Sequence, residues 1–333
     1  MPAGGRLLPT LEAQGGEHVA MAIGRKSLWV FRHVRALRSL LVRERVDIVH
    51  ARSRLPAWIG WLAVRGMPDA IRPRFVTTVH GLNSPSRYSA IMARGERVIC
   101  VSDTVRDYVL RHYPDTDASR LRVVPRGIDP SAFPFRPRPD REARRAIAAL
   151  HPQLGGDGPL PLRPGRATRL QGHADALALP AALRAGGLDA RLWMPGAREV
   201  GREAYIADLE RDAAHGGFAD ALAITPPTAA IAEAYAASDL VLQLSRKPEA
   251  FGRTVIEALS VGRPVLGWAH GGVGELLREL QPQGAVPAFD AAALLRSAQG
   301  LLAQASPVPV TMPYTLPRMQ AATLAIYDQL IDD

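Results

Sequence analysis

Short apolar runs alternate with amphipathic segments through both halves of this chain, and this alternation restricts the fold more than any other feature. It predicts parallel sheets covered by helices, and therefore an α/β fold. We expect strands at 46–51, 74–79, 97–101, 121–125, 190–194, 221–225, 240–244 and 264–268. We expect helices at 28–43, 57–64, 103–112, 202–214, 229–237, 253–261, 291–303 and 317–331.

The length favours two domains, because 333 residues exceed what one ordinary α/β domain needs. A proline-rich segment at 133–139 cannot lie inside a sheet, so we place the linker there. The expected divisions are 1–136, 137–312 and a C-terminal helical segment at 313–333.

Prolines interrupt two elements of the second half. Pro159, Pro161 and Pro164 fall where a buried strand is expected, and Pro180 interrupts a helical run at 175–184. An interior proline costs a helix about 3 kcal/mol, so we expect this helix to break.

The charge is uneven. Residues 1–145 contain 26 Lys+Arg against 13 Asp+Glu, and the remainder contains 15 against 19. A basic first half favours an anionic partner, whether a phosphorylated glycan, an anionic membrane or nucleic acid. The alternative is arginine-rich coding, since only Lys26 and Lys247 are lysines. One cysteine excludes an internal disulfide, and neither a spanning run nor a signal-peptide pattern is visible, so we expect a cytoplasmic protein.

The segment 249–275 carries the strongest chemical signal. Glu249 precedes an expected helix and Glu257 lies inside it, and carboxylates accept hydrogen bonds from vicinal hydroxyls without a metal. The amides of Phe251, Gly252 and Arg253 lie at the helix start, where free N–H groups and the helix dipole attract phosphate. A glycine-rich turn containing Gly271 and Gly272 follows. Together these features suit a ligand that is part sugar and part phosphate, whereas either glutamate alone would be read as a surface acid.

These motifs resemble a GT-B glycosyltransferase of glycosyltransferase family 4. The resemblance covers nearly the whole chain and implies two Rossmann-like domains with parallel sheets facing a cleft. The first domain would bind the acceptor and the second the nucleotide sugar, and the C-terminal helix would return to the first. The family's E-x7-E pattern falls on Glu249 and Glu257, which implies that Glu249 contacts the donor sugar and Glu257 the ribose. The resemblance also implies retention of configuration without a protein nucleophile, a metal or a cofactor.

A second motif at 165–173 resembles the family loop that opens the donor domain. Arg166 occupies the position of the diphosphate-binding arginine, and Gln171 replaces the family lysine. Losing one such electrostatic contact costs roughly 2–4 kcal/mol of transition-state stabilisation. Arg169 is a candidate replacement.

In the first half, His80 follows an expected strand and matches the family histidine near the donor sugar. Arg52 and Arg54 follow another strand and are candidates for an anionic acceptor, with surface charge as the alternative. With the following residues 55–58, this segment resembles transferases that build the lipopolysaccharide core.

The basic amphipathic stretch 25–41 has the composition of interfacial membrane helices, although packing on the sheet is the preferred interpretation of its apolar face. The family's opening strand and Gly-rich loop have no counterpart near residue 1, so we expect an incomplete first domain. A non-catalytic nucleotide-sugar-binding homologue is therefore the alternative function. No nucleic-acid-binding module, zinc cluster or Rossmann fingerprint is visible in the sequence.

Overall fold

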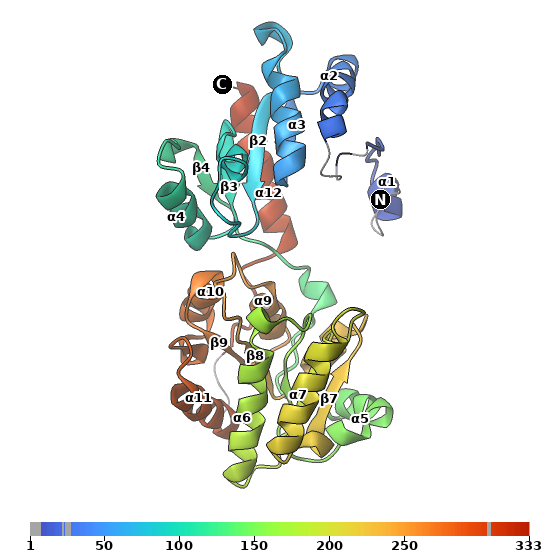
Figure 1. The fold of residues 1–333 in the computed structure, drawn as a ribbon, viewed down its shortest axis with the longest axis vertical. Coiled ribbons are helices and arrows are strands. Elements are labelled where there is room, and N and C mark those ends of the chain that lie inside the picture. Colours follow the sequence, from blue (N-terminus) through green and yellow to red (C-terminus); the bar gives the residue numbers. More distant parts are fainter. Residues whose placement is uncertain (1–7, 22, 24–27, 305–307, 333) are drawn as a thin grey trace. The chain divides into compact units, whose positions relative to one another are not determined.

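The computed structural model describes residues 8–21, 23, 28–304 and 308–332, which belong to two compact units (Figure 1). The first unit comprises Met1–Val101, Val105–Val124 and Ala321–Asp333, and the second comprises Ser102–Thr104 and Pro125–Gln320. Each unit contains one parallel sheet with helices, which confirms the predicted α/β class. The domain boundaries at 136 and 312 stay a prediction.

The sheet of the first unit has four parallel strands in the order β1-β2-β3-β4. Five of the six residues of β2 are buried because this strand lies inside the sheet, whereas three of the four residues of the edge strand β1 are half-buried. The register pairs Ala51 with Thr77, so the carboxyl ends of β1 and β2 lie at the same edge. The strands are β1 Ile48–Ala51, β2 Arg74–Val79, β3 Arg97–Cys100 and β4 Leu121–Val123.

Helix packing in the first unit uses one basic side chain of α2. Arg38 donates from Nε to Ala63 O at 3.0 Å and from Nη2 to Leu62 O at 3.2 Å, which satisfies carbonyls in the last turn of α3. The predicted helix at 28–43 begins with a 3-10 turn at Leu28–Arg32, and residues 25–27 of the amphipathic stretch lie outside the described residues. The helices are α1 Leu8–Ala13, α2 His33–Arg43, α3 Arg54–Arg65, α4 Asp103–His112 and the C-terminal part of α12 Leu316–Asp332.

The sheet of the second unit has six parallel strands in the order β10-β9-β8-β5-β6-β7. Every residue of β6, β7, β8 and β9 is buried, as expected for parallel strands covered on both faces. The strands are β5 Pro161–Leu162, β6 Leu192–Pro195, β7 Leu222–Thr225, β8 Leu240–Gln243, β9 Val265–Trp268 and β10 Ala285–Val286. The helices are α5 Arg141–Leu150, α6 His173–Ala185, α7 Glu203–His215, α8 Ile231–Ala237, α9 Arg253–Ser260, α10 Gly271–Leu280 and α11 Ala291–Ala303.

Prolines shorten β5 but do not break α6. Strand β5 spans only two residues, and Asp239 compensates: its carboxylate accepts the Leu160 N–H at 2.7 Å, and its own N–H donates to Leu160 O at 3.1 Å. The predicted break at Pro180 is wrong, because α6 runs through it. One proline removes one backbone hydrogen bond, and the burial of Leu179 and Leu183 on this helix supports its continuation.

Candidate functional site

The sheet of the second unit reverses its strand order between β5 and β8. In sheets of this kind, ligands bind outside the carboxyl ends of the strands at the point of reversal. The loop after β5 contains Arg166 and Gln171, and the loop after β8 contains Glu249. The topology therefore explains why donor-binding candidates some eighty positions apart in the sequence emerge at neighbouring strands.

Glu249 is held by contacts within its own loop and to the start of α10. Its carboxylate accepts the Ser245 hydroxyl, and its backbone oxygen accepts the Gly272 N–H at 2.8 Å. The Nε2 atom of His270 lies 2.8 Å from Ser245 O. These contacts connect the loop after β8 to the loop after β9 and restrict the half-buried Glu249 side chain. The sequence analysis assigned no role to Ser245 or His270, because neither belongs to a recognisable spacing.

The glycine-rich segment expected as a turn is instead the first turn of α10, which begins at Gly271 with His270 as its N-cap. The reason for glycine here is contact with the protein itself. A Cβ on Gly272 would lie 2.5 Å from Phe251 Cα, and one on Gly271 would lie 2.7 Å from Glu249 O. The φ of Gly271 is also +60°, a conformation that favours glycine. Both glycines thus allow α10 to approach the loop that carries Glu249.

Glu257 lies on α9 with its side chain only 13% exposed. Its Oε1 atom pairs with Arg253 Nε at 2.6 Å, and its Oε2 atom accepts the hydroxyl of buried Tyr235 at 2.9 Å. Burial raises the pKa of Glu257, and the charge of Arg253 and the Tyr235 hydrogen bond partly oppose that rise. The carboxylate is therefore oriented from two sides. Tyr235 was missed, because a tyrosine on a separate helix carries no motif signal.

The other donor candidates differ in exposure. Arg166 is exposed in the loop between β5 and α6, and Gln171 is half-buried at its end. Phe251 is buried, and its ring packs edge-on against Tyr314 with centroids 5.9 Å apart, so this side chain contributes to packing. Gly252 is the N-cap of α9 with φ +115°.

Arg169 makes contacts directed away from Gln171. Its Nη2 atom pairs with Asp208 at 3.0 Å, and its guanidinium lies 5.0 Å from the ring centre of Tyr205. The residue bonded to Gln171 is Arg163, a side chain that the sequence analysis did not consider because it falls among the strand prolines.

In the first unit, the structure brings His80 and Arg52 together. Arg52 donates from Nε to His80 Nε2 at 3.2 Å. Because an arginine side chain only donates, His80 Nε2 accepts this hydrogen bond. Arg54 contacts a different group: it donates to Ser89 Oγ at 3.3 Å and lies 5.5 Å from the ring centre of Tyr88.

His50 links three elements beside these residues. Its Nδ1 atom lies 2.5 Å from the Tyr327 hydroxyl of α12, and its Nε2 atom lies 2.5 Å from Thr78 Oγ1 of β2. Burial raises the pKa of Tyr327. The imidazole therefore joins β1, β2 and α12 and supports the strand end that Arg52 follows.

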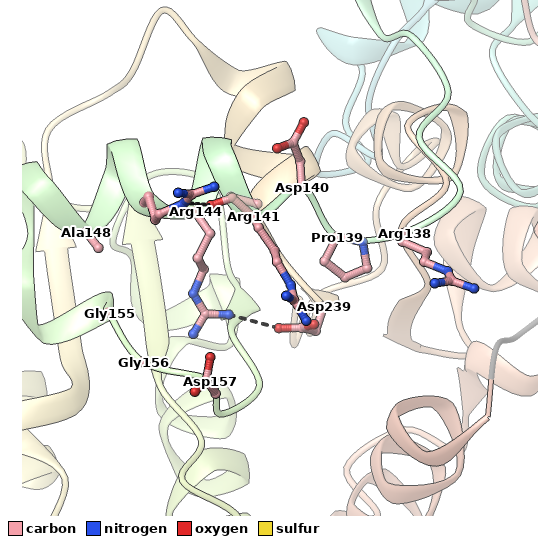
Figure 2. A pocket seen from close by; sticks show the side chains of 12 residues that line it. Arg138, Pro139, Asp140, Arg141, Arg144, Ala148, Gly155, Gly156, Asp157 and Asp239 are labelled. Carbon is pink, nitrogen blue, oxygen red and sulfur yellow. Dashed lines mark hydrogen bonds and ion pairs between the residues drawn. The ribbon is translucent and has the colours of Figure 1, made fainter.

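A pocket of about 540 Å³ is lined by Asp157 and Asp239, which precede the central strands β5 and β8 (Figure 2). Arg144 lines this pocket and forms three hydrogen bonds within the protein. It donates from Nη1 to Asp239 Oδ2 at 3.1 Å, from Nη2 to Gly158 O at 2.8 Å and from Nε to Leu154 O at 3.2 Å. These bonds join the turn before β5 to the start of β8. None of the donor candidates lines this pocket.

Among residues 8–21, 23, 28–304 and 308–332, no group of three His, Cys, Asp or Glu side chains is arranged to hold a metal ion. Within the same residues, no helix combines the length and the apolar character that crossing a membrane requires.

Family comparison agrees with the fold and the motifs. Residues 5–132 match the family described as Glycosyltransferase Family 4, and residues 165–304 match the family described as Glycosyl transferases group 1. The chain carries two glycosyltransferase domains. The resemblance to a GT-B glycosyltransferase is thereby confirmed, whereas its lipopolysaccharide-core type and its incomplete first domain stay predictions.

Curated glycosyltransferases with related sequences are named D-inositol 3-phosphate glycosyltransferase. That of Streptomyces coelicolor is 29% identical over 275 residues, which is 75% of this chain and 60% of the relative. That of Rhodococcus opacus is 29% identical over 263 residues, which is 70% of this chain and 54% of the relative. The chain therefore spans little more than half the length of these relatives.

Solved glycosyltransferase structures share the fold. A glycosyltransferase from Rickettsia africae has a TM-score of 0.83 and 24% identity, covering 99% of this chain and 89% of its own. Anabaena Alr3699/HepE in complex with UDP and glucose has a TM-score of 0.76 and 16% identity, covering 98% and 90%. WaaG, a glycosyltransferase involved in lipopolysaccharide biosynthesis, has a TM-score of 0.60 and 17% identity, covering 98% and 93%. These likenesses confirm the predicted GT-B fold.

Proposed function

We propose that this chain is a retaining glycosyltransferase that moves a hexose or heptose from a nucleotide-diphosphate sugar to a lipopolysaccharide-core or other lipid-linked glycan. The observation that carries this proposal is the arrangement around α9. Glu249 before the helix and Glu257 within it are both held by neighbouring side chains, beside the point where the sheet reverses. Two oriented carboxylates next to helix N-termini suit a ligand with sugar hydroxyls and phosphates.

Each donor-binding residue has a proposed role. Glu257 accepts the ribose hydroxyls, and Glu249 together with His80 orients the donor sugar. Arg166 contacts the diphosphate from its exposed position, and the N–H groups at the starts of α9 and α10 add partial positive charge. The leaving phosphate takes the acceptor proton, so we expect neither a metal nor a cofactor.

The acceptor is inferred from basic side chains, and the place of the protein in the cell is inferred from the acceptor. Arg52 and Arg54 are the candidates for contacting an anionic acceptor, and Arg52 also orients His80 through its 3.2 Å hydrogen bond. Related proteins named for D-inositol 3-phosphate and for the lipopolysaccharide outer core support acceptors of this kind. A cytoplasmic protein that associates with the inner membrane surface fits such an acceptor. Trp29 and Phe31 are exposed in the 3-10 turn Leu28–Arg32 and support contact with lipid.

Donor binding tests this proposal. Isothermal titration of the full chain with UDP, GDP, ADP and their glucose conjugates should reveal binding of at least one diphosphate. Glu257→Gln should weaken nucleotide binding about tenfold, because the ribose loses a charged acceptor worth about 1.5 kcal/mol. Glu142→Gln is the matched control: it neutralises an exposed glutamate of α5 and should leave affinity unchanged.

Turnover separates the proposal from its alternative. Transfer of the sugar to a lipopolysaccharide-core acceptor, lost in Glu249→Gln, would support catalysis. Binding without turnover on any anionic glycan would instead favour a non-catalytic nucleotide-sugar-binding protein. A folded chain that binds none of the three nucleoside diphosphates or their three glucose conjugates would contradict both functions.

A further inference from the structure

Arg163 directly follows β5, at the reversal point of the second unit's sheet. Only 1% of this residue is exposed, so it is a guanidinium enclosed by protein. Burial lowers its pKa to about 10, which still leaves it protonated at neutral pH. A buried charge at this place needs a physical reason, because removing it from water costs several kcal/mol.

The partners of Arg163 are neutral. Its Nε donates to Gln171 O at 3.2 Å, and its Nη2 donates to Gln171 Oε1 at 3.1 Å. Further bonds run from Nη2 to Gln171 O and from Nη1 to Pro164 O. Glu249 is near enough for its charge to favour the protonated form, but no hydrogen bond joins the two. The guanidinium is therefore well bonded and yet not neutralised by a contacting carboxylate.

A second buried group lies at the same loop. His173, in the first turn of the 13-residue helix α6, is 0% exposed; its ring nitrogens meet no partner at full hydrogen-bond geometry, and the backbone at Gly165 and Thr168 is close enough to favour the protonated form. Burial and the charge of Arg163 lower the pKa of His173 to about 3, against smaller opposing effects of the backbone at Gly165 and Thr168. The loop 165–172 thus lies between a buried cation, Arg163, and the N-terminus of α6, and both of these favour an anion.

Gln171 is the loop residue that forms hydrogen bonds with the Arg163 guanidinium. Its side-chain oxygen accepts from Arg163, so a lysine here would place a second cation, an ammonium, about one hydrogen-bond length from the guanidinium. Glutamine avoids that repulsion and fixes the loop by both its backbone and side-chain oxygens. Arg169 is not an equivalent source of charge, because it pairs with Asp208 and is 76% exposed.

We propose that Arg163 is a positioning residue that adds buried positive charge to a diphosphate site at loop 165–172, where Arg166 contacts the ligand, and that it acts through its hydrogen bonds to Gln171. The inference rests on the proposed function for the identity of the ligand as a nucleotide diphosphate. It adds a second cation to this site besides Arg166, at position 163, with Gln171 as its hydrogen-bond partner. Arg163 itself does not contact the ligand.

Titration of the full chain with inorganic pyrophosphate and with UDP tests the pair. Arg163→Met should weaken pyrophosphate binding tenfold or more. Gln171→Lys alone should bring no gain, because two cations then compete for one position. The double variant Arg163→Met/Gln171→Lys should recover affinity to within threefold of wild type. Arg169→Met, which removes an exposed charge from the same loop, should change affinity less than threefold.

Circular dichroism and a thermal melt of each variant show whether the second unit remains folded. Arg163→Lys covers the case in which Arg163→Met unfolds. It keeps the positive charge, so its affinity for pyrophosphate should fall less than fivefold. A double variant as weak as Arg163→Met would reduce Arg163 to a purely structural role and overturn the proposal. A tenfold gain from Gln171→Lys alone would also overturn it.

The two ligands separate this inference from the proposed function. Pyrophosphate binding that follows the expected pattern, without binding of UDP or any other nucleotide, would keep the charge assignment and remove the proposed donor. Nucleotide binding that is equal in all variants would keep the donor and remove the charge assignment. Absence of pyrophosphate binding in the wild type would overturn the diphosphate site.

Discussion

Tyr235→Phe offers a sharp test of how Glu257 is held. The substitution removes one hydroxyl from a side chain that is only 1% exposed and leaves the ring in place. The substitution removes the 2.9 Å hydrogen bond from the Tyr235 hydroxyl to Glu257 Oε2, and with it the contact of the same hydroxyl with the Thr254 side chain. Arg253 remains on the other carboxylate oxygen at 2.6 Å, so the variant isolates a single donor.

The expected loss in the free energy of unfolding depends on the charge of the accepting Glu257 carboxylate. A hydrogen bond to an ionised, largely buried carboxylate is worth about 1.5–3 kcal/mol, and a neutral pair about 0.5–1.5 kcal/mol. Burial already raises the pKa of Glu257 above its ordinary 4.5, so the folded state binds this proton more tightly than the unfolded state. The corresponding stability is present at low pH and is lost as pH rises through the folded pKa.

Removing Tyr235's hydroxyl raises the pKa of Glu257 further, so the penalty grows with pH. We expect Tyr235→Phe to lower the free energy of unfolding by about 2 kcal/mol at pH 7 and by about 1 kcal/mol near pH 4.5. Urea unfolding of the full chain at both pH values, followed by circular dichroism, measures this difference.

Tyr205→Phe is the matched control, because the half-buried Tyr205 makes ring contacts with His173 and Arg169 but its hydroxyl forms no hydrogen bond within the described residues. Tyr205→Phe should lower the free energy of unfolding by less than about 0.5 kcal/mol. Equal penalties for the two variants, or a Tyr235→Phe penalty that does not change with pH, would refute the reasoning about an oriented, ionised Glu257.

Three further substitutions test the fold. Gly172→Ala should destabilise by at least about 2 kcal/mol, because φ is +73° and the new Cβ would lie 1.7 Å from Leu244 O; a loss under about 0.5 kcal/mol would contradict this. Gly300→Ala, in open space inside α11, should raise stability by about 0.5–1 kcal/mol in thermal melts. His173 has its pKa lowered from 6.5 to about 3, so its stability contribution falls by up to about 1.4 kcal/mol per pH unit as pH drops through this window. His173→Phe should flatten that slope in acid-unfolding curves, and an unchanged slope would argue against a buried neutral imidazole.

Much of the fold could be read from the sequence because strand and helix patterns are local. The strand 74–79 and the helices 103–112 and 291–303 have the predicted bounds. The errors came where packing outweighs local preference: α6 continues through Pro180, and the glycines at 271 and 272 begin a helix. In each case, contacts with residues distant in sequence decide the backbone.

Local patterns in the chain were enough to predict the α/β class, Glu249 in a loop and Glu257 in a helix, and the family resemblance added the glycosyltransferase assignment and the place of Arg166. They were enough because spacing and residue type are properties of the chain alone. The partners that hold those groups became visible in the fold: Tyr235 donates to Glu257, and Arg163 donates to Gln171. Such partners come from separate strands and helices, and they meet because a parallel sheet brings the ends of its strands to one edge.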